Sequence, residues 1–178
     1  SEELCASELF GHVRGAFTGA ERSKKGAFRT AGKGLVFLDE VGEAPPGVQA
    51  SLLRVLDDGE VRPVGQIETF VSEAQVIAAT NREPDIDGAI HGIRFDLVQR
   101  LAGFVIRLPA LKDRRDDIIP LAHQFLQQKL VREGRAFSLT SGAKALLQNH
   151  RWPGNVRELR TTLHRASLLS VGNVIDEC

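Results

Sequence analysis

The sequence predicts an α/β fold with a parallel sheet, followed by an all-helical part. Three short apolar runs, 34–38, 76–79 and 104–106, are typical of buried strands, and helical patterns alternate with them. After residue 110 the apolar residues recur only at helical spacing. We therefore expect a first part over residues 1–110 and a helical second part over residues 111–178.

Length and composition are those of an ordinary globular protein. The 178 residues are 42% hydrophobic and 26% charged, which is enough apolar material for a core. Lys+Arg and Asp+Glu both number 23, and this balance argues against a dedicated nucleic-acid-binding domain. No apolar run is long enough to cross a membrane. Cys5 and Cys178 form neither a metal-binding spacing nor a disulfide framework, which favours incidental thiols in the cytoplasm.

The first predicted strand ends in two acids and is followed by a helix. Asp39 and Glu40 come directly after the run 34–38, which is continuous enough to be apolar on both faces. Pro45-Pro46 opens the helix, because a proline in the first turn lacks only an N–H that would be unpaired there. Gly59 ends it. Its apolar stripe consists of Val48, Leu52, Leu53, Val55 and Leu56.

The two acids suggest phosphoryl-transfer chemistry. Ligands of open parallel sheets bind beyond the carboxyl ends of the strands. There, Asp39 can hold Mg²⁺ and Glu40 can orient an attacking water. A solvated turn is an equally good interpretation of this motif alone.

Polar residues also follow the second predicted strand and precede the third. Thr80 and Asn81 can hydrogen-bond a phosphate or a water, although a polar strand end is the commoner role. Arg94 and Arg100 flank a short helical pattern. Guanidinium groups stabilise a transferring phosphoryl group, even from a neighbouring subunit, but most helix arginines are simply solvated.

The helical part is predicted to contain three helices. The first covers 113–133, Thr140 or Ser141 caps the second, and Asn155 caps the third. The apolar side of the first helix consists of Ile118, Leu121, Ala122, Phe125, Leu126 and Leu130. Arg157 lies in the first turn of the last helix, where a cation opposes the helix dipole at about 0.3–1 kcal/mol. A bound phosphate would compensate, as would Glu158 or solvent.

One segment shows neither helical nor strand periodicity. It consists of Gly15, Ala16, Phe17, Thr18, Gly19 and Ala20. We interpret it as a mobile loop that presents Phe17 to a partner, the alternative being a turn with Phe17 tucked into the core. The sequence has no G-x-x-x-x-G-K-[ST] phosphate-binding loop, no H-E-x-x-H zinc motif and no G-x-S-x-G elbow.

Taken together, six segments resemble the motor domain of sigma-54-dependent transcription activators, a group of AAA+ ATPases with a P-loop NTPase-like α/β core and a helical lid. The segments, in family order, are Glu8–His12, Gly15–Ala20, Leu35–Glu40, Ile77–Asn81, Arg94–Leu101 and Trp152–Leu159.

The resemblance implies a role for each candidate residue. Asp39 and Glu40 match the Walker B pair, for Mg²⁺ and the hydrolytic water. Thr80 and Asn81 match the first sensor of the γ-phosphate, and Arg157 matches the second sensor on the lid. Arg94 and Arg100 match arginine fingers that reach a neighbour's ATP. Phe17 and Thr18 match the tip of the loop, Gly15–Ala20, that contacts sigma-54 in the RNA polymerase holoenzyme.

The resemblance also implies an assembly and a longer protein. Such motors form rings of six or seven copies and contact DNA through a separate domain. We expect this chain to be a piece that starts after the phosphate-binding loop, and to bind ATP poorly by itself. The missing first strand would lie between those ending at Asn81 and Arg107.

Two other kinds of function stay open at this point. One is a different AAA+ remodelling ATPase, such as a helicase loader or an unfoldase. The other is a non-catalytic piece that serves for oligomerisation or binds DNA, since helices over 141–150 and 155–168 could form a helix-turn-helix.

Overall fold

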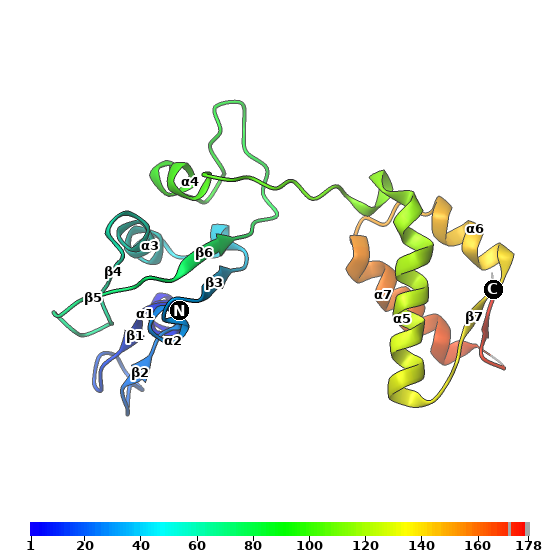
Figure 1. Ribbon diagram of the computed structural model, residues 1–178, viewed down its shortest axis with the longest axis horizontal. Helices are drawn as coiled ribbons and strands as arrows, with labels where there is room; N and C mark the ends of the chain where they lie inside the picture. The colour runs from blue at the N-terminus through cyan, green and yellow to red at the C-terminus, as the bar shows by residue number, and fades with distance from the viewer. Residues whose placement is uncertain (171, 177–178) are drawn as a thin grey trace. The chain divides into compact units, whose positions relative to one another are not determined.

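The computed structural model describes residues 1–170 and 172–176, apart from the side chains of Leu130, Arg132 and Glu133. The chain divides into two compact units, Ser1–Val105 and Ile106–Cys178, each with its own hydrophobic core (Figure 1). Cys178 and the side chain of Leu130, for which the sequence analysis made predictions, lie outside the described part of the chain. Among the described residues, no helix is long and apolar enough to cross a membrane.

Unit 1 combines short strands with four helices. Its elements in chain order are α1 (Glu2–Phe10), β1 (Gly11–His12), β2 (Lys24–Lys25), α2 (Ala27–Ala31), β3 (Leu35–Leu38), the 3₁₀ turn η1 (Val41–Glu43), α3 (Pro46–Asp58), β4 (Glu60–Val61), β5 (Phe70–Val71), β6 (Gln75–Ala78) and α4 (Phe95–Leu101). Cys5 on α1 is a free thiol whose pKa is raised by burial, as expected of an incidental cysteine.

The parallel pair β3–β6 is the centre of unit 1. The register runs from Leu35 opposite Gln75 to Leu38 opposite Ala78. Val36 and Leu38 face the core and lie in one buried cluster with residues of α3 and α4. These strands and α3 confirm the sequence-based prediction, including the left-handed Gly59 (φ 71°) that ends α3.

The third predicted strand is wrong. Residues 104–106 form no strand, and Phe104 is 85% exposed. A strand needs backbone partners, and in the described part of the chain none pairs with this run. The outward face of β3–β6 is apolar and uncovered as well, with Leu35, Phe37 and Ile77 at least half exposed.

Unit 2 is helical apart from one small strand pair. Its elements are the 3₁₀ turns η2 (Leu111–Asp113) and η3 (Arg115–Asp117), then α5 (Ile118–Glu133), β7 (Ser138–Leu139), α6 (Ser141–Asn149), α7 (Asn155–Leu169) and β8 (Val174–Ile175). The parallel bridge β7–β8 departs from the all-helical prediction. Thr140 caps α6 as predicted, since its hydroxyl accepts a hydrogen bond from the Ala143 N–H.

The first helix of unit 2 starts later than predicted. It begins at Ile118, and the preceding residues form two 3₁₀ turns. Pro120 explains the start, because its missing N–H and its ring are tolerated only in the first turn of a helix.

The predicted cap of α7 is also wrong. Gly154 is the N-cap, and Asn155 is the first helical residue, in a left-handed conformation (φ 50°). The Asn155 side chain instead accepts a hydrogen bond of 2.8 Å from the N–H of Leu111, a residue that is fully buried. Asn155 therefore joins the start of unit 2 to α7 rather than capping its own helix.

This contact leads to a stability prediction. Asn155→Gly keeps the left-handed backbone but leaves the Leu111 N–H unpaired, so we expect unit 2 to lose about 1–3 kcal/mol of unfolding free energy. Asn155→Ala should lose about a further 1–2 kcal/mol, because an Ala Cβ disfavours the left-handed region. Urea unfolding followed by fluorescence of Trp152, the only tryptophan and a core residue of unit 2, measures both. Asn149→Ala, at the exposed end of α6, is the control. Wild-type stability of Asn155→Gly would contradict the assigned role.

Candidate functional site

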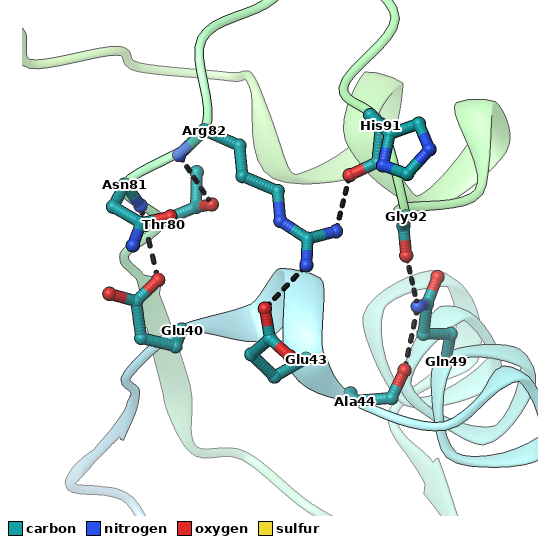
Figure 2. A network of polar contacts seen from close by, with 9 residues as sticks. All are labelled: Glu40, Glu43, Ala44, Gln49, Thr80, Asn81, Arg82, His91 and Gly92. Carbon is teal, nitrogen blue, oxygen red and sulfur yellow. Dashed lines mark hydrogen bonds and ion pairs between the residues drawn. The ribbon is translucent and has the colours of Figure 1, made fainter.

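Polar residues from distant parts of unit 1 meet at the carboxyl ends of β3 and β6. The backbone N–H of Asn81 donates a hydrogen bond of 3.1 Å to Oε2 of Glu40, across 41 positions of sequence (Figure 2). The adjacent backbones are joined too, since the N–H of Val41 donates to the Ala79 carbonyl at 3.0 Å. The parallel pairing thus brings the acidic turn and the Thr80–Asn81 segment to one edge of the sheet.

Glu40 has an unusual backbone. Its φ of 51° lies in the left-handed region, which costs a residue with a side chain about 1–2 kcal/mol. The hydrogen bond from the Glu43 N–H to the Glu40 carbonyl, 2.8 Å long, holds this conformation at the start of η1. Residues held in such conformations cluster at active sites and switch regions, although three other non-glycine residues of the described chain, Trp152, Asn155 and Asn173, also have positive φ.

Asp39 and Asn81 offer open polar groups beside Glu40. Within the described residues, neither the Asp39 carboxylate nor the Asn81 side-chain amide has a hydrogen bond or ion pair, and both residues are exposed. The Thr80 hydroxyl accepts a hydrogen bond of 3.2 Å from the Arg82 N–H. Exposed carboxylate oxygens are the ligands that Mg²⁺ prefers, so Asp39 fits the metal that the sequence predicts.

A buried side-chain amide on α3, which the sequence analysis did not single out, contacts the segment that precedes α4. Gln49 on α3 is only 3% exposed. Its Nε2 donates to the carbonyls of Ala44, at 2.8 Å, and Gly92, at 2.7 Å (Figure 2). Its Oε1 accepts from the Arg94 N–H at 2.8 Å. The signal was available, because Gln49 occupies the same face of α3 as the buried Leu52.

Arg82 was missed as well. Its guanidinium Nη1 donates to the His91 carbonyl at 2.6 Å, and its Nη2 forms an ion pair with Glu43 (Figure 2). The segment before α4 is therefore joined to η1 through Arg82 and to α3 through Gln49.

The two candidate finger arginines are paired with local acids and not with Glu40 or Asn81. Arg94 makes a bidentate contact with Asp96, in which Nε donates to Oδ1 at 3.1 Å and Nη2 donates to Oδ2 at 2.7 Å. These hydrogen bonds raise the pKa of Arg94 and lower the pKa of the Asp96 carboxyl below its usual value. Arg100 Nε lies 2.7 Å from Asp57 Oδ1 at the end of α3. Both guanidinium groups are about half exposed.

The loop Gly15–Ala20 connects β1 to β2 and is closed by a 2.8 Å hydrogen bond from the Gly15 N–H to the Ala20 carbonyl. Gly15 and Gly19 have φ values of 81° and 97°, which glycine adopts readily. Phe17 is half-buried edge-on against the His12 ring, with centroids 5.0 Å apart, while Thr18 and Gly19 are exposed. Phe17 thus lies on the surface of unit 1 and outside its buried core cluster.

Arg157 belongs to unit 2, whereas the other candidate residues of the ATP site belong to unit 1. It is exposed in the first turn of α7. Glu158 accepts a 2.8 Å hydrogen bond from the Gly154 N–H, and in the described part of the chain it makes no ion pair with Arg157. The Glu158 carboxylate nevertheless lies in the same first turn and binds the N-cap N–H, so it offsets the unfavourable effect of Arg157 at the helix N-terminus, as the sequence allowed.

The hollows found in the described structure do not include the candidate residues of unit 1. Two hollows among residues 1–170 and 172–176 are lined by other side chains, for instance Arg54 and Arg62 in one and Phe28 and Phe70 in the other. The same residues contain no cluster of three or more His, Cys, Asp or Glu side chains suited to a metal. The site is thus an open edge of the sheet.

Comparisons with known proteins identify the family. The family model described as the Sigma-54 interaction domain matches residues 1–107, and that of the AAA+ ATPase lid domain matches residues 112–177. The Nif-specific regulatory protein of Klebsiella pneumoniae is 46% identical over 98% of this chain. The anaerobic nitric oxide reductase transcription regulator NorR of Escherichia coli (strain 55989 / EAEC) is 45% identical over 95% of it.

The chain spans about a third of these relatives, 33% of the first and 34% of the second. Solved structures of NtrX from Brucella abortus have the same fold. The complex with ATP gives a TM-score of 0.83 at 31% identity, covering 99% of this chain and 39% of that one. The complex with ADP gives 0.82 at 32% identity, covering 99% and 38%. The chain therefore belongs to the sigma-54 interaction domain family of AAA+ ATPases and carries both the sigma-54 interaction domain and the AAA+ lid.

Proposed function

We propose that this chain is most of the motor domain of a cytoplasmic sigma-54-dependent transcription activator. The activator hydrolyses ATP in a ring and remodels the RNA polymerase holoenzyme at the promoter. The observation that carries the proposal is the hydrogen bond between Glu40 and Asn81. It joins the proposed hydrolytic carboxylate to the proposed γ-phosphate sensor, as a shared nucleotide site requires. The relatives named as transcription regulators and the ATP and ADP complexes of NtrX support it.

In this proposal each residue has one task at the ATP site. Glu40 accepts a proton from the attacking water and orients it towards the γ-phosphate. Asp39 holds Mg²⁺, which supplies charge neutralisation on the phosphate oxygens when bound. Asn81 and Thr80 bind the γ-phosphate region or its water through their amide and hydroxyl. Arg157 contributes its cation from the lid.

The remaining residues act between subunits and on the polymerase. Arg94 and Arg100 reach the ATP of the neighbouring subunit and stabilise the charge of the transferring phosphoryl group. The loop Gly15–Ala20 contacts sigma-54, with Phe17 and Thr18 at its tip. Nucleotide state then changes the position of this loop, as in other γ-phosphate switches.

The loop provides the test of this function. In a longer version of the protein that includes a phosphate-binding loop upstream of Ser1, we expect Phe17→Ala to abolish sigma-54-dependent transcription while ATP hydrolysis stays within about twofold. The reason is that the half-buried Phe17 ring belongs to the proposed polymerase contact and lies outside the buried core. In vitro transcription and phosphate release measure the two activities.

A matched change at an exposed apolar residue outside the loop serves as the control. Ile86 is fully exposed, and Ile86→Ala should affect neither activity. If Phe17→Ala still activated transcription, the chain would be better explained as another kind of AAA+ remodelling ATPase.

A further inference from the structure

The segment that precedes Arg94 is held from one side by a buried amide. Gln49 uses its two Nε2 hydrogen bonds on carbonyls, those of Ala44 and Gly92, and its Oε1 on the Arg94 N–H. Both ends of the amide group are therefore engaged, and its orientation is determined. Because Gln49 is 3% exposed, loss of these contacts cannot be made good by water without opening the core.

The same segment is held from the other side by Arg82. The Arg82 guanidinium passes between Gly42 and Gly92, where a Cβ on Gly92 would collide with it and a Cβ on Gly42 would lie 3.3 Å from its Cδ. It binds the His91 carbonyl and Glu43. Its own backbone N–H binds the Thr80 hydroxyl, one residue before Asn81. Figure 2 shows these contacts, together with those of Glu40 and Gln49, as one polar network whose two halves are joined through the backbone of His91 and Gly92.

The backbone position of Arg94 depends on this polar network. Arg94 is the N-cap residue of α4, and its side chain makes no capping hydrogen bond to the helix. Its backbone N–H is bound to Gln49. Its side chain is about half exposed and, among the described residues, hydrogen-bonds Asp96 on its own helix, so a shift of its backbone would carry this side chain along.

We propose that Gln49, supported by Arg82, is the positioning residue that orients the Arg94 side chain towards the neighbouring subunit. It also couples this orientation to the Glu40–Asn81 hydrogen bond of its own subunit. The inference rests on the proposed function, since it takes Arg94 as the residue that acts on the neighbour's ATP. Gln49 touches no nucleotide in this scheme. Its effect passes through the backbone of residues 92–94 to the Arg94 guanidinium.

The test uses Gln49→Leu in the longer protein with the phosphate-binding loop. Leu is close to Gln in volume and removes all three hydrogen bonds. A displacement of about 1 Å at a catalytic group can cost about 100-fold, so we expect kcat for ATP hydrolysis to fall about 10- to 100-fold. The dissociation constant for a fluorescent ATP analogue should change less than twofold. Amide hydrogen exchange of the peptide 91–95 should become at least about tenfold faster.

A mixing experiment separates positioning from general damage. Gln49→Leu subunits keep Glu40 but offer a misplaced finger, whereas Glu40→Gln subunits cannot hydrolyse but offer a correct one. Mixed rings should therefore be more active than either variant alone. Val55→Ala, which creates a cavity on the same helix, is the control for lost stability. A fall in kcat of equal size in Val55→Ala, without faster exchange at 91–95, would overturn the proposal.

A second variant covers the case in which Gln49→Leu fails to fold. Arg82→Gln changes a partly exposed side chain and should lower kcat about 3- to 10-fold, again with unchanged nucleotide affinity. Normal kcat in Arg82→Gln and in any folded Gln49→Leu would overturn this inference alone, provided that Arg94→Ala is impaired. Normal kcat in Arg94→Ala would overturn both the finger role and this inference.

Discussion

Replacing Arg94 with alanine is expected to lower kcat for ATP hydrolysis about 1,000-fold in a longer protein that carries a phosphate-binding loop. Arginine fingers are worth about 10³–10⁵ in kcat, because the guanidinium neutralises charge that develops on the transferring phosphoryl group. Affinity for ATP should change little, since the finger acts mainly in the transition state. Single-turnover phosphate release gives the rate, and equilibrium titration with a fluorescent analogue gives the affinity.

The structure suggests why lysine will not substitute well for Arg94. The contact with Asp96 uses Nε and Nη2 together, and a lysine ammonium cannot reproduce this planar fork. Arg94→Lys should therefore remain at least about 100-fold impaired. Arg54→Ala, an exposed arginine on α3, is the matched control and should be neutral. Rates near wild type in Arg94→Ala would mean that the fingers are supplied by other residues.

Glu40→Gln is expected to lower kcat by about 10²–10⁴ while ATP binding is retained. Positioned acid–base groups contribute rate factors of this size, and an amide cannot accept the proton of the attacking water. The substitution is a sharp test because the amide oxygen of Gln can still accept the hydrogen bond from the Asn81 N–H. Loss of rate therefore reports lost chemistry rather than a lost structural contact.

The control for Glu40→Gln is Glu83→Gln, a nearby exposed glutamate that makes no hydrogen bond or ion pair within the described residues. It should hydrolyse ATP normally. Near-normal phosphate release by Glu40→Gln, with ATP bound, would place water activation elsewhere and would remove the residue on which the proposed mechanism depends.

Much of the local structure could be predicted from the sequence. The continuous run before Asp39 predicts a strand, and β3 is found there, although only its Val36 and Leu38 face is buried. Pro46 and Gly59 mark the ends of α3, and Thr140 caps α6. These signals act through nearest neighbours along the chain, so no knowledge of distant contacts was needed.

Most errors of the sequence analysis concern partners that lie far away in the chain. Residues 104–106 have the composition of a strand but no backbone partner in the described structure. Asn155 has the chemistry of a cap, yet it binds the N–H of Leu111, 44 positions away. The start of α5 is the exception, because Pro120 signalled it locally.

The sequence by itself determined the helices α3 to α7 to within a few residues, the strands β3 and β6, and which residues carry oxygen, amide and guanidinium groups. Only the tertiary structure decided that Glu40 contacts Asn81 and that Gln49 holds the backbone of Arg94, because each of these hydrogen bonds joins residues more than 40 positions apart. Periodicity and capping record the environment of a residue along its own helix or strand. The partner of a buried amide is chosen by the packing of whole elements, which no local pattern encodes.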